Sequence, residues 1–211
     1  MKRLIISVII AGFPWFVNGQ NAAEVFVGHK GVAFELLNSN DLDSARRWNL
    51  FTITRFETSY EKDSLSTPDF YTVNPLLTYA FTKNIGLSAG GYYSFDQFVP
   101  QVALNITYFN EKGLFLNLFP TLEVQENPNF EIFGIINFSP RLSTNWKLYT
   151  QVLFGTNFNT KEHNISYQLI RVGLDYKGFQ FGLGGNIREF SSDWIYSGNY
   201  GVFIRKNFSV Y

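Results

Sequence analysis

The feature that most constrains this sequence is a repeated alternation of apolar with small or polar side chains, residue by residue, from Trp48 onward. It runs through residues 70–82, 85–95, 98–109, 113–125, 130–140, 146–158, 166–176, 179–187 and 200–210. Successive side chains of a β-strand point to opposite faces, so this alternation predicts strands whose two faces meet different surroundings. No stretch keeps the three-and-four spacing of an amphipathic helix. We therefore predict an all-β chain with almost no helix.

The length of the predicted strands points to a membrane. Strands of globular proteins usually have about five or six residues, whereas a tilted strand needs roughly 9 to 11 residues to cross a bilayer. The stretches above are mostly of the longer kind. Short connections such as 82–84 and 177–178 alternate with longer or more polar ones such as 61–69 and 189–197. Short turns at one rim and longer loops at the other predict an antiparallel up-and-down transmembrane β-barrel.

Aromatic side chains gather at both ends of the predicted strands. Near the short turns lie Trp48, Phe81, Tyr108, Phe138, Trp146, Tyr176, Phe179 and Phe208. Near the longer loops lie Phe56, Tyr60, Tyr71, Tyr93, Phe95, Phe130, Phe154, Phe190 and Tyr200. Two such rows, separated by Leu, Val and Ile, are the girdles expected where a barrel crosses the two membrane interfaces.

Four prolines fall within or at the end of these strands, on the apolar face. They are Pro75, Pro100, Pro120 and Pro140. Because proline removes a donor from the ladder of backbone hydrogen bonds, we expect a bulge or a strand end at each of them.

Residues 1–19 have the three-part layout of a secretory signal peptide. Lys2 and Arg3 are followed by an apolar stretch to Val17, and Val17 and Gly19 suit the −3 and −1 positions of a cleavage site before Gln20. The stretch is shorter than the roughly 20 residues of a spanning helix.

The chain has no cysteine, so a lipid-modified N-terminus, disulfides and thiolate metal sites are excluded. Its formal net charge of +0 argues against binding to nucleic acid.

The signal segment, the repeated strands and the terminal strand at 200–211 (YGVFIRKNFSVY) together resemble the outer-membrane β-barrel proteins of Gram-negative bacteria. The resemblance is architectural and covers the whole chain after the signal segment. It implies the outer membrane as location, and membrane lipid and the barrel-assembly machinery as partners. The terminal strand departs from the usual pattern, because Tyr211 is out of phase with the apolar face and Lys206 interrupts it. Near the periplasmic rim, Lys206 could snorkel toward water.

The strand count from the sequence is ten to twelve. Ten strands are predicted between Trp48 and the end of the chain, with another candidate at 25–37. Bacterial single-chain barrels have even strand numbers. We therefore divide the chain into a signal peptide (1–19), an N-terminal segment (20–47) and a transmembrane barrel (48–211). The N-terminal segment is either a first strand or a periplasmic or luminal extension.

If the apolar faces point to lipid, the charged side chains on the other face point into the lumen. They are Arg55, Glu57, Glu123, Glu131, Lys147, Arg171, Asp175, Arg188 and Arg205. The two signs nearly balance, and buried charges persist when they are paired, so an internal network of ion pairs could close a small barrel. Bulky inward side chains would fill more of it: Phe115, Phe119, Phe133, Tyr149 and Phe203. We predict a narrow or plugged lumen, in which paired charges favour a plug and a one-sided lining favours conduction.

The leading hypothesis for function is porin-like passage or binding of small solutes through a narrow polar lumen. The alternative is a plugged structural or adhesion barrel that acts through its extracellular loops, and a lipid-modifying outer-membrane enzyme comes third. We predict no enzyme and no cofactor, because the only histidines, His29 and His163, have no catalytic signature around them. Glu123 and Glu131 are expected to pair with luminal arginines rather than to form an acid–base dyad or a calcium site. Glycine-rich 182–185 lies inside a strand, where it would ease curvature rather than bind phosphate.

Overall fold

The computed structural model describes residues 19–60, 70–94 and 97–210, and this part of the chain forms twelve β-strands. They are β1 (Gly19–Gly28), β2 (Gly31–Asp41), β3 (Trp48–Ser59), β4 (Phe70–Ala80), β5 (Ile85–Ser94), β6 (Gln97–Phe109), β7 (Leu114–Glu123), β8 (Phe130–Phe138), β9 (Trp146–Phe158), β10 (His163–Tyr176), β11 (Phe179–Phe190) and β12 (Ile195–Val210). Over the same residues, no helix is long and apolar enough to span a membrane.

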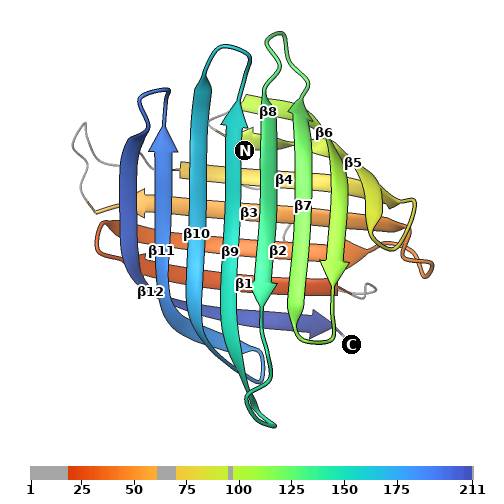
Figure 1. Cartoon of the computed structure of the whole chain (residues 1–211), viewed down its shortest axis with the longest axis vertical. Helices are drawn as coiled ribbons and strands as arrows, with labels where there is room; N and C mark the ends of the chain where they lie inside the picture. The colour runs from red at the N-terminus through yellow and green to blue at the C-terminus, as the bar shows by residue number, and fades with distance from the viewer. Residues whose placement is uncertain (1–18, 61–69, 95–96, 211) are drawn as a thin grey trace, which may run out of the picture.

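The strands form one closed antiparallel barrel. Each strand pairs with its neighbours in sequence, and β1 closes the barrel by pairing with β12, from Gly19 opposite Val210 to Gly28 opposite Gly201. In Figure 1, β7 to β12 run down the wall that faces the viewer, while β1 to β4 cross behind them at a steep angle. Such crossing is expected of opposite walls in a barrel whose strands tilt from its axis.

The even strand number brings both ends of the described chain to one rim. We call this the terminal rim; it holds Gly19 and Val210 and the connections β2–β3, β4–β5, β6–β7, β8–β9 and β10–β11. The opposite rim, where β1 joins β2, β7 joins β8, β9 joins β10 and β11 joins β12, is the loop rim. The predicted contrast between short turns and longer loops is not seen among the described connections, because those at the terminal rim range from two residues (177–178) to seven (139–145) and those at the loop rim from two (29–30) to six (124–129).

The strand count and the fold class are confirmed, but the predicted start of the barrel at Trp48 is wrong. Residues 20–47 are neither a single strand nor an extension, because they supply β1 and β2, which are full members of the wall. The hairpin between them turns at His29 and Lys30. The polar start of β1, Gln20 and Asn21, hides its alternation in the sequence, and so this strand looks too short to span. The predicted signal peptide lies outside the described residues, except for Gly19, which opens β1.

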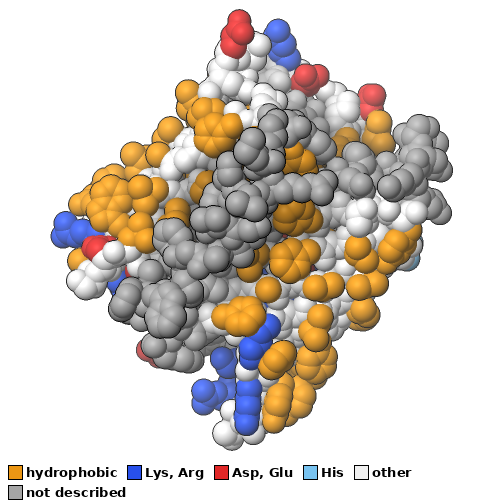
Figure 2. Space-filling model, turned by 180° about the vertical axis from the view of Figure 1, so that it is seen from behind, with side chains coloured by type: hydrophobic (Ala, Val, Ile, Leu, Met, Phe, Trp, Pro, Cys, Tyr) orange, Lys and Arg blue, Asp and Glu red, His pale blue; other side chains and the backbone are white. Residues whose placement is uncertain are grey.

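The outer face of the barrel is apolar and bordered by aromatic side chains, as predicted. All eight aromatic residues predicted at the short turns are exposed, and within this row Trp48 packs on Tyr79 and Trp146 on Tyr176, with ring centroids 4.9 and 4.8 Å apart. Of the row predicted at the longer loops, Phe56, Tyr60, Tyr93, Phe130 and Tyr200 are exposed, Tyr71, Phe154 and Phe190 are half-buried, and Phe95 lies outside the described residues. Phe98, Phe158, Trp194 and Tyr196 are exposed at the same rim, although the sequence did not assign them to the row. In Figure 2 apolar side chains spread over the visible wall, and charged ones lie at its margins.

Lys206 and the prolines qualify this picture. The ammonium of Lys206 lies 3.8 Å from the centroid of the Phe179 ring, so the cation rests on an aromatic side chain at the terminal rim.

Pro140 follows the end of β8, as expected. Pro75 and Pro120 leave gaps in the β4–β5 and β6–β7 ladders without a change of register, and Pro100 lies opposite Gly91 within β6. The expectation of bulges at these three prolines is therefore wrong, and β10 instead has an irregularity between His163 and Ile165.

A charge on the outer wall tests its contact with lipid. Leu183 of β11 is 70% exposed, and in lipid vesicles the substitution Leu183→Arg is expected to lower the free energy of unfolding by about 2–4 kcal/mol. The matched control is Leu142→Arg, in the β8–β9 turn at the terminal rim, which should change it by less than about 0.5 kcal/mol. Denaturant titration of both variants measures this, and equal effects would contradict a lipid-facing wall at Leu183.

Candidate functional site

The register of the sheet places charged and polar side chains in one row that climbs around the inside of the barrel. Directly opposite neighbours follow one another across eight strands, β9 to β12 and then β1 to β4: Lys147, Asp175, Gln180, Arg205, Glu24, Glu35, Arg55 and Thr72. Residues directly opposite in an antiparallel pair have neighbouring side chains on the same face. The row therefore brings acidic and basic groups from distant parts of the sequence within reach of one another.

Four arginines and three glutamates form a continuous chain of ion pairs inside the barrel. Their order is Arg171, Glu24, Arg205, Glu35, Arg55, Glu57 and Arg188. The shortest contacts are Arg171 Nη2 to Glu24 Oε1 at 2.7 Å and Arg188 Nη2 to Glu57 Oε2 at 2.8 Å. Every side chain in the chain is at least nine-tenths buried. Arg188 reaches Glu57 from β11 to β3, so the chain links strands that are not neighbours in the wall.

Arg171 is the most enclosed member of this chain, with 1% of its surface exposed. Its guanidinium carbon lies 4.6 Å from the centroid of the Phe26 ring and 5.8 Å from that of Phe203, and its Nη1 donates to the backbone carbonyl of Ile170 at 2.9 Å. A Cβ at Gly184 would lie 3.0 Å from the Cδ of Arg171. The glycine-rich stretch at 182–185 therefore leaves room for the Arg171 side chain. From the sequence, these glycines were expected only to ease the curvature of the strand.

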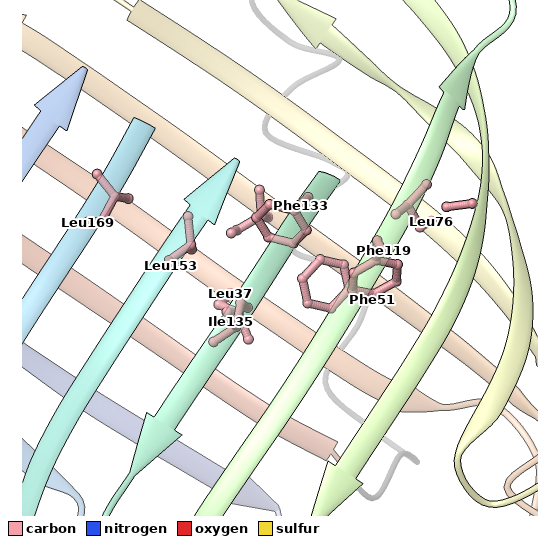
Figure 3. Close-up of a cluster of buried hydrophobic side chains, with 10 residues drawn as sticks. Leu37, Phe51, Leu76, Phe119, Phe133, Ile135, Leu153 and Leu169 are labelled. Atoms are coloured by element: carbon pink, nitrogen blue, oxygen red, sulfur yellow. The ribbon is translucent and has the colours of Figure 1, made fainter. Parts of the chain in front are cut away.

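The other half of the interior is filled by apolar side chains. Ten buried residues form a cluster, shown in Figure 3: Leu37, Phe51, Ile53, Leu76, Ala103, Phe119, Phe133, Ile135, Leu153 and Leu169. Its centre is aromatic, with the Phe119 ring 5.2 Å from Phe51 and 5.7 Å from Phe133 between centroids. Of the bulky inward residues that the sequence predicts, Phe119, Phe133, Tyr149 and Phe203 are buried, and Phe115 packs against the cluster. Apolar packing and ion pairs together fill the middle of the lumen.

Two of the predicted luminal charges, Lys147 and Asp175, are not members of the ion-pair chain. Lys147 has the inward parity of β9 but lies at the terminal rim, where it is exposed. Asp175 accepts hydrogen bonds from the backbone N–H of Gly178 and from the Gln180 amide, both at 2.9 Å. It thus holds the two-residue β10–β11 turn, in which Lys177 and Gly178 have the positive φ angles of 50° and 81° that a type I′ hairpin requires.

Glu123 and Glu131 do not pair with arginine, and that expectation is wrong. Among the described residues neither carboxylate belongs to a salt bridge. Glu131 accepts from the Tyr167 hydroxyl at 3.1 Å and from the Gln101 amide at 3.4 Å. The reason is position: the arginines lie on β3 and β10 to β12, whereas these glutamates lie on β7 and β8 at the loop rim.

Glu123 is fully buried and is held by three side-chain amides instead. Asn157 donates to its Oε1 at 2.6 Å, and Asn129 and Gln125 donate to its Oε2 at 2.7 and 3.2 Å. Above this group, at the loop rim, a cavity of about 640 Å³ opens. Its lining is Tyr92, Gln97, Gln125, Glu126, Asn127, Asn129, Asn157, Asn159, Asn164 and Ile165.

Sequence reasoning missed Glu24 and Glu35, two of the three acidic members of the ion-pair chain. They lie directly opposite each other on β1 and β2, inside the segment that was left open as an extension. A signal for them exists in the sequence, because Ala22, Glu24 and Phe26 alternate with Ala23, Val25 and Val27 before the turn at His29. The amide-lined cavity was also missed, since its residues come from the β7–β8 and β9–β10 connections and from the ends of β5, β6, β9 and β10.

His163 lies beside a serine at the loop rim. Its Nε2 is 2.9 Å from Ser166 Oγ, and its Nδ1 is 2.9 Å from the carbonyl oxygen of Ser191, which as an acceptor places the proton of a neutral ring on Nδ1. Ser166 is only 6% exposed, and Trp194 stacks on the imidazole with centroids 4.2 Å apart. In this arrangement the histidine ties the β11–β12 connection to β10. The absence of enzymatic activity stays a prediction.

The ion-pair chain makes a prediction about stability. Arg171→Met leaves Glu24 with only the longer 3.6 Å contact to Arg205, and we expect a loss of about 3–5 kcal/mol in the free energy of unfolding because a buried charge loses its partner. The double variant Arg171→Met/Glu24→Gln should recover part of this loss. Arg46→Met, which removes the exposed contact to Asp41, is the control and should change stability by less than about 1 kcal/mol. A deficit in Arg171→Met no larger than the control would show that the pair is not required.

Comparisons with known proteins find only distant similarities. No family model matches the chain, and no curated protein matches it. Among solved structures it is similar to LpxR from Salmonella typhimurium, with 9% identity and a TM-score of 0.48 over 90% of this chain and 100% of that chain. It is also similar to OmpT, an outer membrane protein of Vibrio cholerae, with 10% identity and a TM-score of 0.39 over 90% and 98%. A porin mutant of Rh. blastica matches with 9% identity and a TM-score of 0.29 over 92% and 99%. These similarities are too distant to transfer a function.

Proposed function

We propose that this protein is a closed outer-membrane barrel of a Gram-negative bacterium, which does not conduct solutes and acts at its loop rim. Export by the N-terminal signal segment, contact with outer-membrane lipid and assembly by the barrel-assembly machinery belong to the same proposal. Its apolar wall between two aromatic rows supports the location. Of the functions that the sequence left open, this is the plugged barrel rather than the porin-like one.

The observation that carries the proposal is the packing of the lumen. Seven charged side chains pair in one chain inside the barrel, and two clusters of ten and four buried apolar side chains pack beside them. A barrel of about eight strands is filled by its own side chains, whereas barrels of 16 to 18 strands enclose an aqueous channel. In a barrel of twelve strands, the side chains that line the lumen decide whether it is filled or open. Here they include the buried rings of Phe119 and Tyr149 rather than a ring of like charges around water.

The pairing of the charges argues in the same direction. Conducting pores keep solutes moving by lining their path with side chains that water can reach. Here the arginines contact glutamates at 2.7–3.6 Å and are almost fully buried, so they are neutralised by the protein itself. Among the described residues, the interior opens to solvent at the loop rim in the amide-lined cavity, and we place the working surface there.

Conductance in a planar lipid bilayer tests the proposal. The folded protein is expected to give no single-channel steps at protein amounts at which a general porin, reconstituted in parallel, gives many. The fold of the same preparation is checked on a detergent gel, where unboiled and boiled samples should migrate differently. Repeated steps of uniform size from the folded protein would contradict a closed lumen and restore porin-like passage as the function.

A further inference from the structure

The cavity at the loop rim has an unusual lining. Seven of its lining side chains are primary amides, and the other three are one phenol, one aliphatic side chain and one carboxylate. Among the described residues no lysine or arginine lines it, so they offer an anion no counter-charge, and Ile165 offers little surface to an apolar ligand. Its volume of about 640 Å³ falls within the range of about 300–1,000 Å³ that is typical of sites for small molecules.

The amides of this cavity are held in fixed orientations. Glu123 can only accept, so Asn157 and Asn129 must turn their N–H groups toward it. Their carbonyl oxygens accept in turn from Asn164 at 2.7 Å and from Asn159 at 3.4 Å. Two relays of amides therefore lead from one buried carboxylate to the cavity wall. An amide has two N–H donors and two acceptor lone pairs, and these bonds use one of each on Asn157 and Asn129.

The negative charge of Glu123 is stabilised by the hydrogen bonds from these amides. Three amide N–H groups converge on its two oxygens, and the residue has no exposed surface. What reaches the cavity is thus a set of neutral donors and acceptors, side by side, together with the ring of Tyr92 and the single carboxylate of Glu126. Neighbouring hydroxyl groups of a sugar both donate and accept, and they complement paired amide donors and acceptors; an aromatic ring can cover the C–H face of the same molecule.

We propose that this cavity binds a short neutral carbohydrate, of one or two sugar units, with Glu123 as the positioning residue for the amides that contact it. This inference rests on the proposed function in one respect: the loop rim is the working surface of the barrel. The substrate class follows from the lining, which offers an anion no counter-charge, an apolar ligand little surface, and a cation only the carboxylate of Glu126 among its described residues.

Isothermal titration of the folded protein in a sugar-free zwitterionic detergent tests the proposal, with maltose, glucosamine and glucuronate as probes. Maltose should give a saturable isotherm, and glucuronate should bind at least about tenfold more weakly because Glu126 repels it. The variants Asn129→Ala and Glu123→Gln should each weaken maltose binding at least about tenfold, as a hydrogen-bonding partner is lost or misdirected. Asn145→Ala, an exposed amide in the β8–β9 turn at the terminal rim, is the matched control and should bind as wild type does.

Each alternative outcome overturns the assignment. No saturable maltose binding, or equal binding by Asn129→Ala and the control, would show that the cavity is not a sugar site. Binding of glucosamine at least about tenfold tighter than maltose would mean that the acidic groups select a cation. The gel mobility of unboiled samples shows whether each variant is folded. If the folded protein neither binds sugar nor conducts in a planar bilayer, this inference is refuted and the closed barrel stands. If it binds sugar and also conducts, the closed barrel is refuted and the sugar site stands.

Discussion

Charge that is buried inside a protein has to be neutralised by the protein, and the interior of this barrel is arranged around that requirement. Arg55, Arg171, Arg188 and Arg205 all lie in the lumen with less than a tenth of their side chains exposed. Glutamates alternate with them along the ion-pair chain, so that each of the three carboxylates meets two arginines. Removing one partner leaves the other buried without compensation, which makes the chain a single unit.

The rest of the interior follows from where this unit lies. The arginines come from β3 and β10 to β12, and Gly184 on β11 leaves room for the buried side chain of Arg171. On the opposite side, inward apolar side chains of β2 to β4 and β6 to β10 close the space that the ion pairs do not fill. Glu123 lies beyond both groups at the loop rim and is stabilised by amides, because no arginine reaches it. Ion pairs and apolar side chains thus pack against one another inside the barrel, and the polar cavity faces the loop rim.

Much of the fold could be predicted from the sequence because a barrel wall has a strict period of two. In β4, Leu76 and Thr78 are buried in the lumen and Leu77 is exposed on the outer face, as the alternation over residues 70–82 requires. The aromatic row at the terminal rim followed from the strand ends alone. The start of the barrel could not be predicted, since the polar residues at the head of β1 obscure its alternation. The ion-pair partners across the lumen could not be predicted from the sequence either. Arg171 and Glu24 are 147 positions apart, and only the register of a closed sheet brings them together. The same holds for Glu123, whose amide partners come from β9 and from the β7–β8 connection.

Access of a water-soluble reagent to the lumen tests the closed interior most directly. The chain has no cysteine, so one introduced cysteine is the only thiol. Ser88 of β5 has no exposed surface and lies 2.7 Å from Thr78, oxygen to oxygen, inside the barrel. In the Ser88→Cys variant, a charged thiol reagent added to both sides of lipid vesicles should leave the thiol unmodified, while the exposed Lys147→Cys variant is modified to completion. Modification of both variants at similar rates would contradict a packed lumen.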